Sequence, residues 1–201
     1  VSGTFFDLAL SLFHNAKKLI QNGSGPYFYL PKLEHYLECR MLNEVISFCE
    51  KKLDIEVGTV KVTVLIETIN AVFQMDEFLW ELKDHIVGLN AGRWDYLFSY
   101  QKVYRNTKKV ILPDRSKVNM FVPFMSNYNK LLVDTCHKRG AFGMGGMSAQ
   151  VIAKANPKEV NEKALANVKK DKKRELDQGN DGAWVAHPSL VEPVKNIFEK
   201  N

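Results

Sequence analysis

The stretch VLIETINAVFQMDEFLWELKDHIVGLNAGRWDYLFS, residues 64–99, decides how the rest of the chain is interpreted. Together with the preceding VKVT it forms an unbroken β-branched and aliphatic run, which is typical of a strand buried on both faces. A segment with the apolar spacing of a helix separates this run from a second short apolar run at residues 85–90. The stretch therefore predicts a strand–helix–strand unit of a parallel sheet.

Two carboxylates stand at the ends of these two predicted strands. Glu67 closes the first strand, and Asp95 follows the second strand 28 residues later. Carboxylate oxygens that converge at neighbouring strand ends favour a hard cation, most naturally Mg²⁺, which takes few carboxylates and completes its shell with water and substrate. The spacing equally allows two charges at loop starts that pair with Arg93 or Lys61, and both interpretations remain open on the spacing alone.

The composition excludes several classes of protein. The chain has 201 residues, of which 45% are hydrophobic and 25% charged, as expected for one globular core. No apolar run approaches the roughly 20 residues of a membrane span, so we expect no membrane partner. The net charge of +5 comes without a reader motif for nucleic acid, so no nucleic acid partner is expected either. Three cysteines, an odd number, indicate a reducing compartment.

Strand-like and helix-like segments alternate along the whole chain. Six strands are predicted, over residues 26–32, 60–67, 86–90, 112–123, 141–147 and 182–188. The helix expected after residue 156 has a basic end that predicts a solvated face, formed by Lys169, Lys170, Lys172, Lys173 and Arg174. Such alternation predicts a parallel sheet covered by helices.

A closed barrel and an open doubly wound sheet both fit this alternation. The barrel is favoured because no glycine-rich phosphate loop follows a first strand. In addition, polar or unusual residues end nearly every predicted strand, as in a barrel that collects its site at one face: Lys32, Glu67, Asp95, Pro123, Gln150 and His187. We therefore expect an α/β fold, an incomplete (β/α)₈ TIM-type barrel with about six of its eight units, and about two strands outside residues 1–201.

Several motifs resemble one known family closely. These motifs are GPYFYLPKLEHYLE, VTVLIETINAVFQMDE, DHIVGLNAGRWDYLFSY, ILPDRS, VPFM, TCHKRGAFGMGGM and NDGAWVAHPSLV. Through them the chain is similar, along essentially all of its length, to malate synthases of the shorter A type. The resemblance implies a (β/α)₈ barrel that condenses acetyl-CoA with glyoxylate and hydrolyses the thioester to malate and CoA. It also implies a location in the cytoplasm, or in the peroxisomal or glyoxysomal matrix.

The resemblance also implies roles for individual residues. It places Mg²⁺ on Glu67 and Asp95, with glyoxylate and acetyl-CoA as small-molecule substrates. The turn Gly92-Arg93-Trp94 would present backbone N–H groups to the glyoxylate carboxylate, with Gly92 allowing a close approach. For the side chains of Arg93 and Trp94, a role as loop anchors on the barrel rim is an equal alternative.

Three further residues have weaker implied roles around the same pocket. Trp184 resembles the family's aromatic wall around the acetyl group, although a tryptophan of the core fits the sequence nearly as well. Pro188 would shape the same pocket, and Lys32 would face the site from the end of its strand.

The resemblance identifies no catalytic residue within the chain. The family's base is an aspartate of a C-terminal helical domain, opposed by an arginine from a loop that would precede residue 1. We therefore expect residues 1–201 to form a single partial barrel domain, without the family's N-terminal part and C-terminal helical domain, and to be inactive alone. Residues Val151–Lys154 replace the family's usual Ile-Pro-Ile-Lys, which puts CoA contacts there in doubt. The alternatives are a Mg²⁺-dependent C–C lyase of the citrate lyase β-subunit type and a truncated, catalytically dead paralogue.

Overall fold

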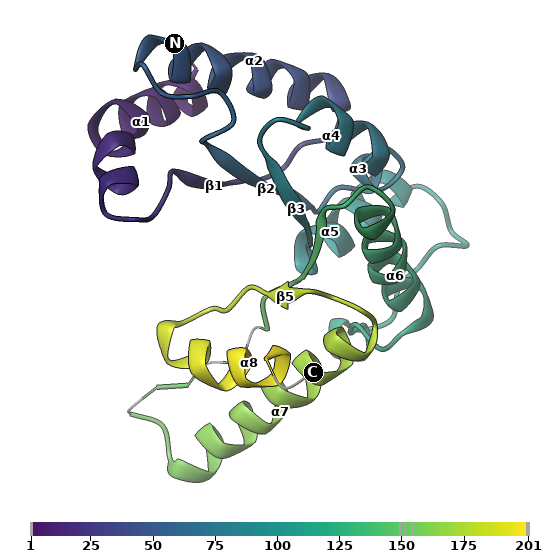
Figure 1. Ribbon diagram of the computed structural model, residues 1–201. Coiled ribbons are helices and arrows are strands. Elements are labelled where there is room, and N and C mark those ends of the chain that lie inside the picture. Colours follow the sequence, from purple (N-terminus) through teal and green to yellow (C-terminus); the bar gives the residue numbers. More distant parts are fainter. Residues whose placement is uncertain (1, 149, 151, 154, 200–201) are drawn as a thin grey trace.

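The computed structural model describes residues 2–148, 150, 152–153 and 155–199. Its centre is one parallel sheet whose strands follow chain order, which Figure 1 shows as a curved row. The strands are β1 (Tyr27–Leu30), β2 (Lys61–Ile66), β3 (Ile86–Ala91), β4 (Phe142–Gly145) and β5 (Gly182–Ala183). Thr63 pairs with Gly88, and Leu89 pairs with Gly143, so each strand extends the sheet in the same direction.

Helices follow the strands and cover one face of the sheet. Eight α-helices lie among the described residues: α1 (Gly3–Gln21), α2 (Tyr36–Lys52), α3 (Ile69–Val72), α4 (Met75–Glu81), α5 (Trp94–Tyr104), α6 (Pro123–Lys138), α7 (Lys158–Asp177) and α8 (Val191–Phe198). Two short 3₁₀ turns, η1 (Arg115–Lys117) and η2 (Pro188–Leu190), interrupt the loops. In Figure 1, α7 and α8 lie side by side near β5, away from α1 and α2.

The apolar run of β2 is buried on the face that carries Val62, Val64 and Ile66, whereas Lys61 and Thr63 on the other face are partly exposed, so the predicted burial on both faces is only partly confirmed. Val62, Val64 and Ile66 are essentially inaccessible and pack towards the helices. The main core joins the sheet to α1 through α6, and a small second cluster of Val168, Leu190 and Val194 holds α8 on α7. All three cysteines are buried and free.

The strand predicted over residues 112–123 does not form. The segment carries the turn η1, and β3 pairs directly with β4. The side chain of Asp114 accepts a hydrogen bond from the backbone N–H of Ser116 at 2.9 Å, and that of Asn119 accepts one from Phe121 at 2.9 Å. These local turns compete with a sheet ladder for the backbone donors, so the alternating apolar residues here anchor a loop instead.

The sheet is an open arc, as expected for an incomplete barrel. Five strands are present among the described residues rather than the expected six, and β1 and β5 form its two edges. The fold class is confirmed, whereas the number of strand–helix units was overestimated by the loop at 112–123. Within the described part of the chain, no helix combines the length and apolar character needed to cross a membrane.

Candidate functional site

Gly92 brings the ends of β2 and β3 together. Its backbone N–H donates to the carbonyl of Ile66 at 3.0 Å, and a Cβ at this position would lie 2.5 Å from the Cβ of Glu67. The buried Tyr128 hydroxyl, from α6, donates to the same Ile66 carbonyl. Only glycine allows this approach. Gly92 therefore places the segment that follows β3 in direct contact with Glu67, which follows β2.

The carboxylates of Glu67 and Asp95 converge on one cation. The Lys32 ammonium Nζ lies 3.0 Å from Glu67 Oε2 and 3.0 Å from Asp95 Oδ2. The Lys32 backbone N–H also donates to Glu67 Oε1 at 2.8 Å. The convergence predicted from spacing is therefore present, and the partner is neither Arg93 nor Lys61. Lys32 has a φ of 61°, a left-handed conformation that is uncommon outside glycine and is found preferentially at functional sites.

The two carboxyl groups differ in burial and in pKa. The Glu67 side chain is 5% exposed and that of Asp95 is 51% exposed. Burial raises the pKa of Glu67, and the neighbouring Asp95 adds to this, although hydrogen bonds from Lys32 oppose it. Burial also opposes the ionisation of Asp95, but hydrogen bonds from Lys32 and Glu67 outweigh it and lower the pKa of Asp95.

This donor set fits a hard divalent cation. Two carboxylates already gather around a single ammonium, which is 61% exposed and stands in for such a cation. The described residues contain no cluster of three or more His, Cys, Asp or Glu side chains with metal-binding geometry. A cation held here would thus keep most of its coordination positions for water and substrate, as Mg²⁺ prefers.

Helix α5 begins beside the carboxylate pair and offers free backbone donors. The first residues of a helix have N–H groups without an intrahelical acceptor, and the helix dipole favours anions there. The N–H of Gly92 is already committed to Ile66, which corrects the expectation that all of Gly92-Arg93-Trp94 would face a ligand. The donors of this turn that remain come from Arg93 and Trp94.

The side chains of Arg93 and Trp94 are both engaged away from the carboxylate pair. Arg93 Nη2 donates to Asp171 Oδ2 at 2.7 Å and to Glu175 Oε1 at 2.5 Å. The Trp94 ring lies under the guanidinium of Arg115, whose central carbon is 4.6 Å from the ring centre. The loop-anchor alternative fits both side chains, and it leaves the backbone as the part of this turn that is available to a ligand.

Trp184 lies on the far side of the arc and contacts β1. Its backbone N–H donates to the carbonyl of Gly145 at 3.0 Å, and its ring stacks on Tyr29 with centres 4.9 Å apart. Trp184 is 38% exposed, so it is not a core tryptophan. Pro188 is exposed at the start of η2. In the segment Val151–Lys154, Val151 and Lys154 lie outside the described residues. The doubt about CoA contacts there therefore stays a prediction.

Sequence reasoning missed the buried charges of α7. Lys172 and Glu175 are inaccessible and Arg174 is nearly so, whereas Lys169, Lys170 and Lys173 are exposed. The predicted solvated face is therefore wrong for two of its five residues. A signal was present: the apolar positions Ala164 and Val168 continue at helical spacing through 172 and 175, so the buried stripe runs into the charged residues.

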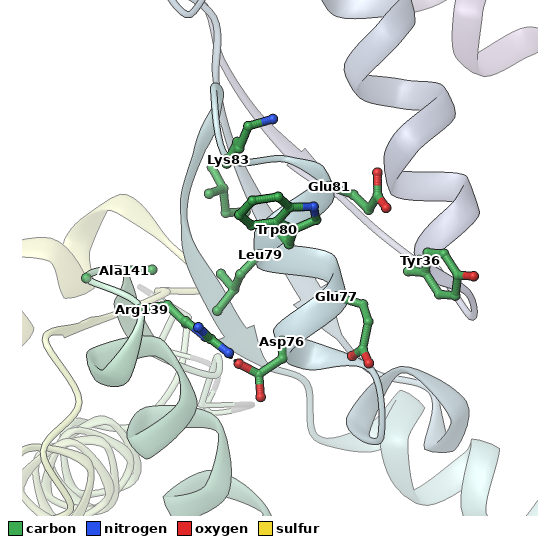
Figure 2. Close-up of a pocket in the computed structure, with 11 residues that line it drawn as sticks. Tyr36, Asp76, Glu77, Leu79, Trp80, Glu81, Lys83, Arg139 and Ala141 are labelled. Atoms are coloured by element: carbon green, nitrogen blue, oxygen red, sulfur yellow. Dashed lines mark hydrogen bonds and ion pairs between the residues drawn. The ribbon is translucent and has the colours of Figure 1, made fainter.

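A large groove lies elsewhere on the described part of the molecule. It has a volume of about 770 Å³ and lies along α4, with Tyr36, Trp80 and Arg139 among its lining residues (Figure 2). Two of its charges pair across the surface, with 2.6 Å between Arg139 Nε and Asp76 Oδ1. It shares no lining residue with the carboxylate pair. The carboxylate pair and this groove are therefore separate features.

Comparisons with known proteins agree on one family. The model of the malate synthase TIM barrel domain matches residues 1–201. Malate synthase A of Escherichia coli is 50% identical over 198 residues, which are 98% of this chain and 37% of that protein. The glyoxysomal malate synthase of Candida tropicalis is 51% identical over 201 residues, which are 100% of this chain and 36% of that protein. The chain thus spans little more than a third of these relatives.

Solved structures share the fold at low identity. A citrate lyase of Burkholderia xenovorans superposes with a TM-score of 0.74 at 19% identity, covering 96% of this chain and 53% of that one. A malate synthase of Haloferax volcanii, in a ternary complex with pyruvate and acetyl-CoA, gives a TM-score of 0.71 at 12% identity, with 96% and 46% covered. At these identities the superpositions show a common fold alone.

Proposed function

The chain belongs to the malate synthase family, whose TIM barrel domain it matches along its whole length, and we propose that it supplies the metal- and glyoxylate-binding part of a malate synthase. The proposed reaction joins the methyl carbon of acetyl-CoA to the aldehyde carbon of glyoxylate, and water then cleaves the thioester to give malate and CoA. The observation that carries the proposal is the meeting of the Glu67 and Asp95 carboxylates at one cation, 3.0 Å from each.

Each side of the proposed site has a distinct task. Glu67 and Asp95 hold the divalent cation, and the free N–H groups at the start of α5 bind the carboxylate of glyoxylate. Bound Mg²⁺ would supply Lewis acidity that polarises the aldehyde towards attack. Lys32, the one ammonium beside both carboxylates in the described part of the site, faces the same ligand and balances its charge.

The acetyl side of the proposed site lies across the arc. Trp184, stacked on Tyr29, forms an aromatic wall, and Pro188 shapes the entrance four residues further on. We assign no proton transfer to any residue of this chain, because neither the base nor the opposing arginine of the family matches a position in it. The proposed location is the cytoplasm or the peroxisomal or glyoxysomal matrix.

A lyase of the citrate lyase β-subunit type is the weaker proposal. The citrate lyase that superposes here is 19% identical, whereas the curated malate synthases are about half identical over nearly the whole chain. The motif GLNAGRWDY is also the part of the sequence that surrounds the carboxylate pair.

The proposal is tested by calorimetric titration of glyoxylate into the chain with and without Mg²⁺. We expect binding that requires Mg²⁺, and no malate from acetyl-CoA and glyoxylate with the 201-residue chain alone. Binding should also be largely lost in Asp95→Asn, for which Asp84→Asn is the matched control, because Asp84 is an exposed carboxylate whose ion-pair contact is a weak one of 3.8 Å to Lys83. Binding that is equal without Mg²⁺, or turnover well above background by the chain alone, would contradict the proposal.

A further inference from the structure

A buried ionic network lies behind the rim segment 92–95. Arg93 reaches back to Asp171 and Glu175, which are four residues apart and therefore on one face of α7. Ser148 adds a hydrogen bond of 2.5 Å from its Oγ to Asp171 Oδ2. The side chain of Glu175 is inaccessible and that of Arg93 is 14% exposed, so water contributes little to these contacts.

Lys172 ties the same network to strand β4. Its Nζ donates to the carbonyl of Gly146 and lies 2.9 Å from Glu175 Oε2. Burial raises the pKa of Glu175 and lowers the pKa of Lys172, the pattern of charges taken out of water. The network thus connects three separate stretches of chain, after β3, after β4 and on α7.

Two glycines make room for this network. A Cβ on Gly145 would lie 2.0 Å from Glu175 Oε2, and a Cβ on Gly146 would lie 2.3 Å from the carbonyl oxygen of Ala91 and 3.0 Å from Arg93 Nε. Gly145 and Gly146 therefore leave the space in which Glu175 reaches Arg93. The backbone is shaped around the ionic contacts rather than around an apolar core.

Such a network is not explained by stability. Moving charges from water into a protein costs free energy that their attraction often fails to recover, and apolar replacements are frequently as stable. The network does fix a position, because a planar guanidinium held by two carboxylates has little freedom. Arg93 is two residues from Asp95, so the segment is held from behind by α7 and in front by Lys32 and Glu67.

We propose that Arg93 and Glu175 are positioning residues that hold the rim segment 92–95 so that its backbone donors and Asp95 face glyoxylate. The proposal rests on the function proposed above. Neither side chain touches the substrate. They act through the backbone of residues 93–95, and Asp171 shares this task.

The test uses Arg93→Lys and Glu175→Gln in the intact protein that carries these residues. We expect the KM for glyoxylate to rise about tenfold or more, because small displacements of binding groups cost rate steeply. The KM for acetyl-CoA should stay within about twofold. In the ligand-free protein, the amides of residues 93–96 should exchange hydrogen faster than in the wild type. Asp171→Asn is a second, less buried variant in case Glu175→Gln fails to fold.

Glu50→Gln is the matched control, since Glu50 is an equally buried carboxylate at the opposite end of the sheet. It should lower thermal stability and leave the KM for glyoxylate unchanged. The positioning proposal is overturned if Glu175→Gln lowers thermal stability while glyoxylate KM and local exchange stay at wild-type values, or if Glu50→Gln raises that KM equally. A wild type that fails to bind glyoxylate with Mg²⁺ would instead overturn the proposed function, and the positioning role with it.

Discussion

Carboxylates lie at both ends of strands β2 and β3, but their surroundings differ between the two ends. Before the strands begin, Glu50 lies 2.9 Å from His85 Nε2 and accepts the backbone N–H groups of Val60, at 2.7 Å, and Gly58, at 3.1 Å. His85 Nδ1 is 2.7 Å from the Asn43 side-chain oxygen. Every partner belongs to the protein, and both Glu50 and His85 are inaccessible.

At the opposite ends of the same strands, the groups are only partly satisfied by the protein. The side chains of Asp95 and Lys32 are both more than half exposed. Asp95 contacts the ammonium of a flexible lysine side chain, which another cation can replace. Three polar side-chain atoms in the described structure are buried without a partner, and two of them, Asn90 Oδ1 and Arg93 Nε, lie on or just after β3. At one end of the sheet the polar groups are therefore paired within the protein, whereas the other end is the one that we propose binds a ligand, as in barrels generally.

The largest effect that would sharpen this comparison is expected from Glu50→Ala. Removing the buried Glu50 carboxylate leaves the His85 ring and two backbone N–H groups without their hydrogen-bond partner, which costs roughly 3–5 kcal/mol of the free energy of unfolding, at about 1–3 kcal/mol for each unsatisfied group. Urea denaturation measures this. Glu44→Ala, on the exposed face of the same helix, should stay within about 0.5 kcal/mol. Equal losses in the two variants would show that the Glu50 network adds no stability.

Asp95→Asn should have the opposite pattern of effects, with a large loss of ligand binding and a small change in stability. It should weaken Mg²⁺-dependent glyoxylate binding about 100-fold, since a ligand charge is lost, while the thermal midpoint changes little because Asp95 is half exposed. Calorimetry and thermal denaturation of the same samples give both numbers. If the stability falls as far as in Glu50→Ala, the two ends of the sheet do not differ in the way described above.

A smaller effect is expected from Trp184→Leu. The stacked contact with Tyr29 is worth about 0.5–1.5 kcal/mol, so its loss should raise the KM for acetyl-CoA a few-fold in the intact protein and leave Mg²⁺ binding unchanged. Phe73→Leu replaces an aromatic residue that is highly exposed elsewhere and serves as the control. An unchanged acetyl-CoA KM would remove Trp184 from the proposed acetyl wall.

The weakest effect expected is reversible self-association of the isolated 201-residue chain. The edge strand β1 exposes Tyr27, and an apolar groove of about 490 Å³ between α1 and α2 is lined by Phe6, Phe13 and Phe48. Open edges and apolar patches of this kind favour association. Size-exclusion chromatography over a range of concentrations measures it. A concentration-independent monomer with a cooperative thermal transition would contradict the prediction.

The sequence by itself determined the elements whose pattern is local. The run VKVTVLI forms a strand whose alternate residues Val62, Val64 and Ile66 are buried, and Gly92 allows the close approach to Glu67 after the next strand. The convergence of Glu67 and Asp95 was predictable because the carboxyl ends of neighbouring parallel strands meet at one edge, whatever the remaining strands do. The resemblance of these motifs to one family agreed with the pattern.

Only the tertiary structure decided which patterns find partners. Residues 112–123 alternate like a strand, yet Asp114 and Asn119 bind their own backbone and β3 pairs with β4 instead. The sequence predicts that Lys172 is solvated, but the structure buries it. This burial depends on the space that Gly145 and Gly146 leave beside Glu175. Periodicity specifies which face of a segment is apolar, but pairing and charge burial depend on residues far apart in the chain, so they exist only after folding.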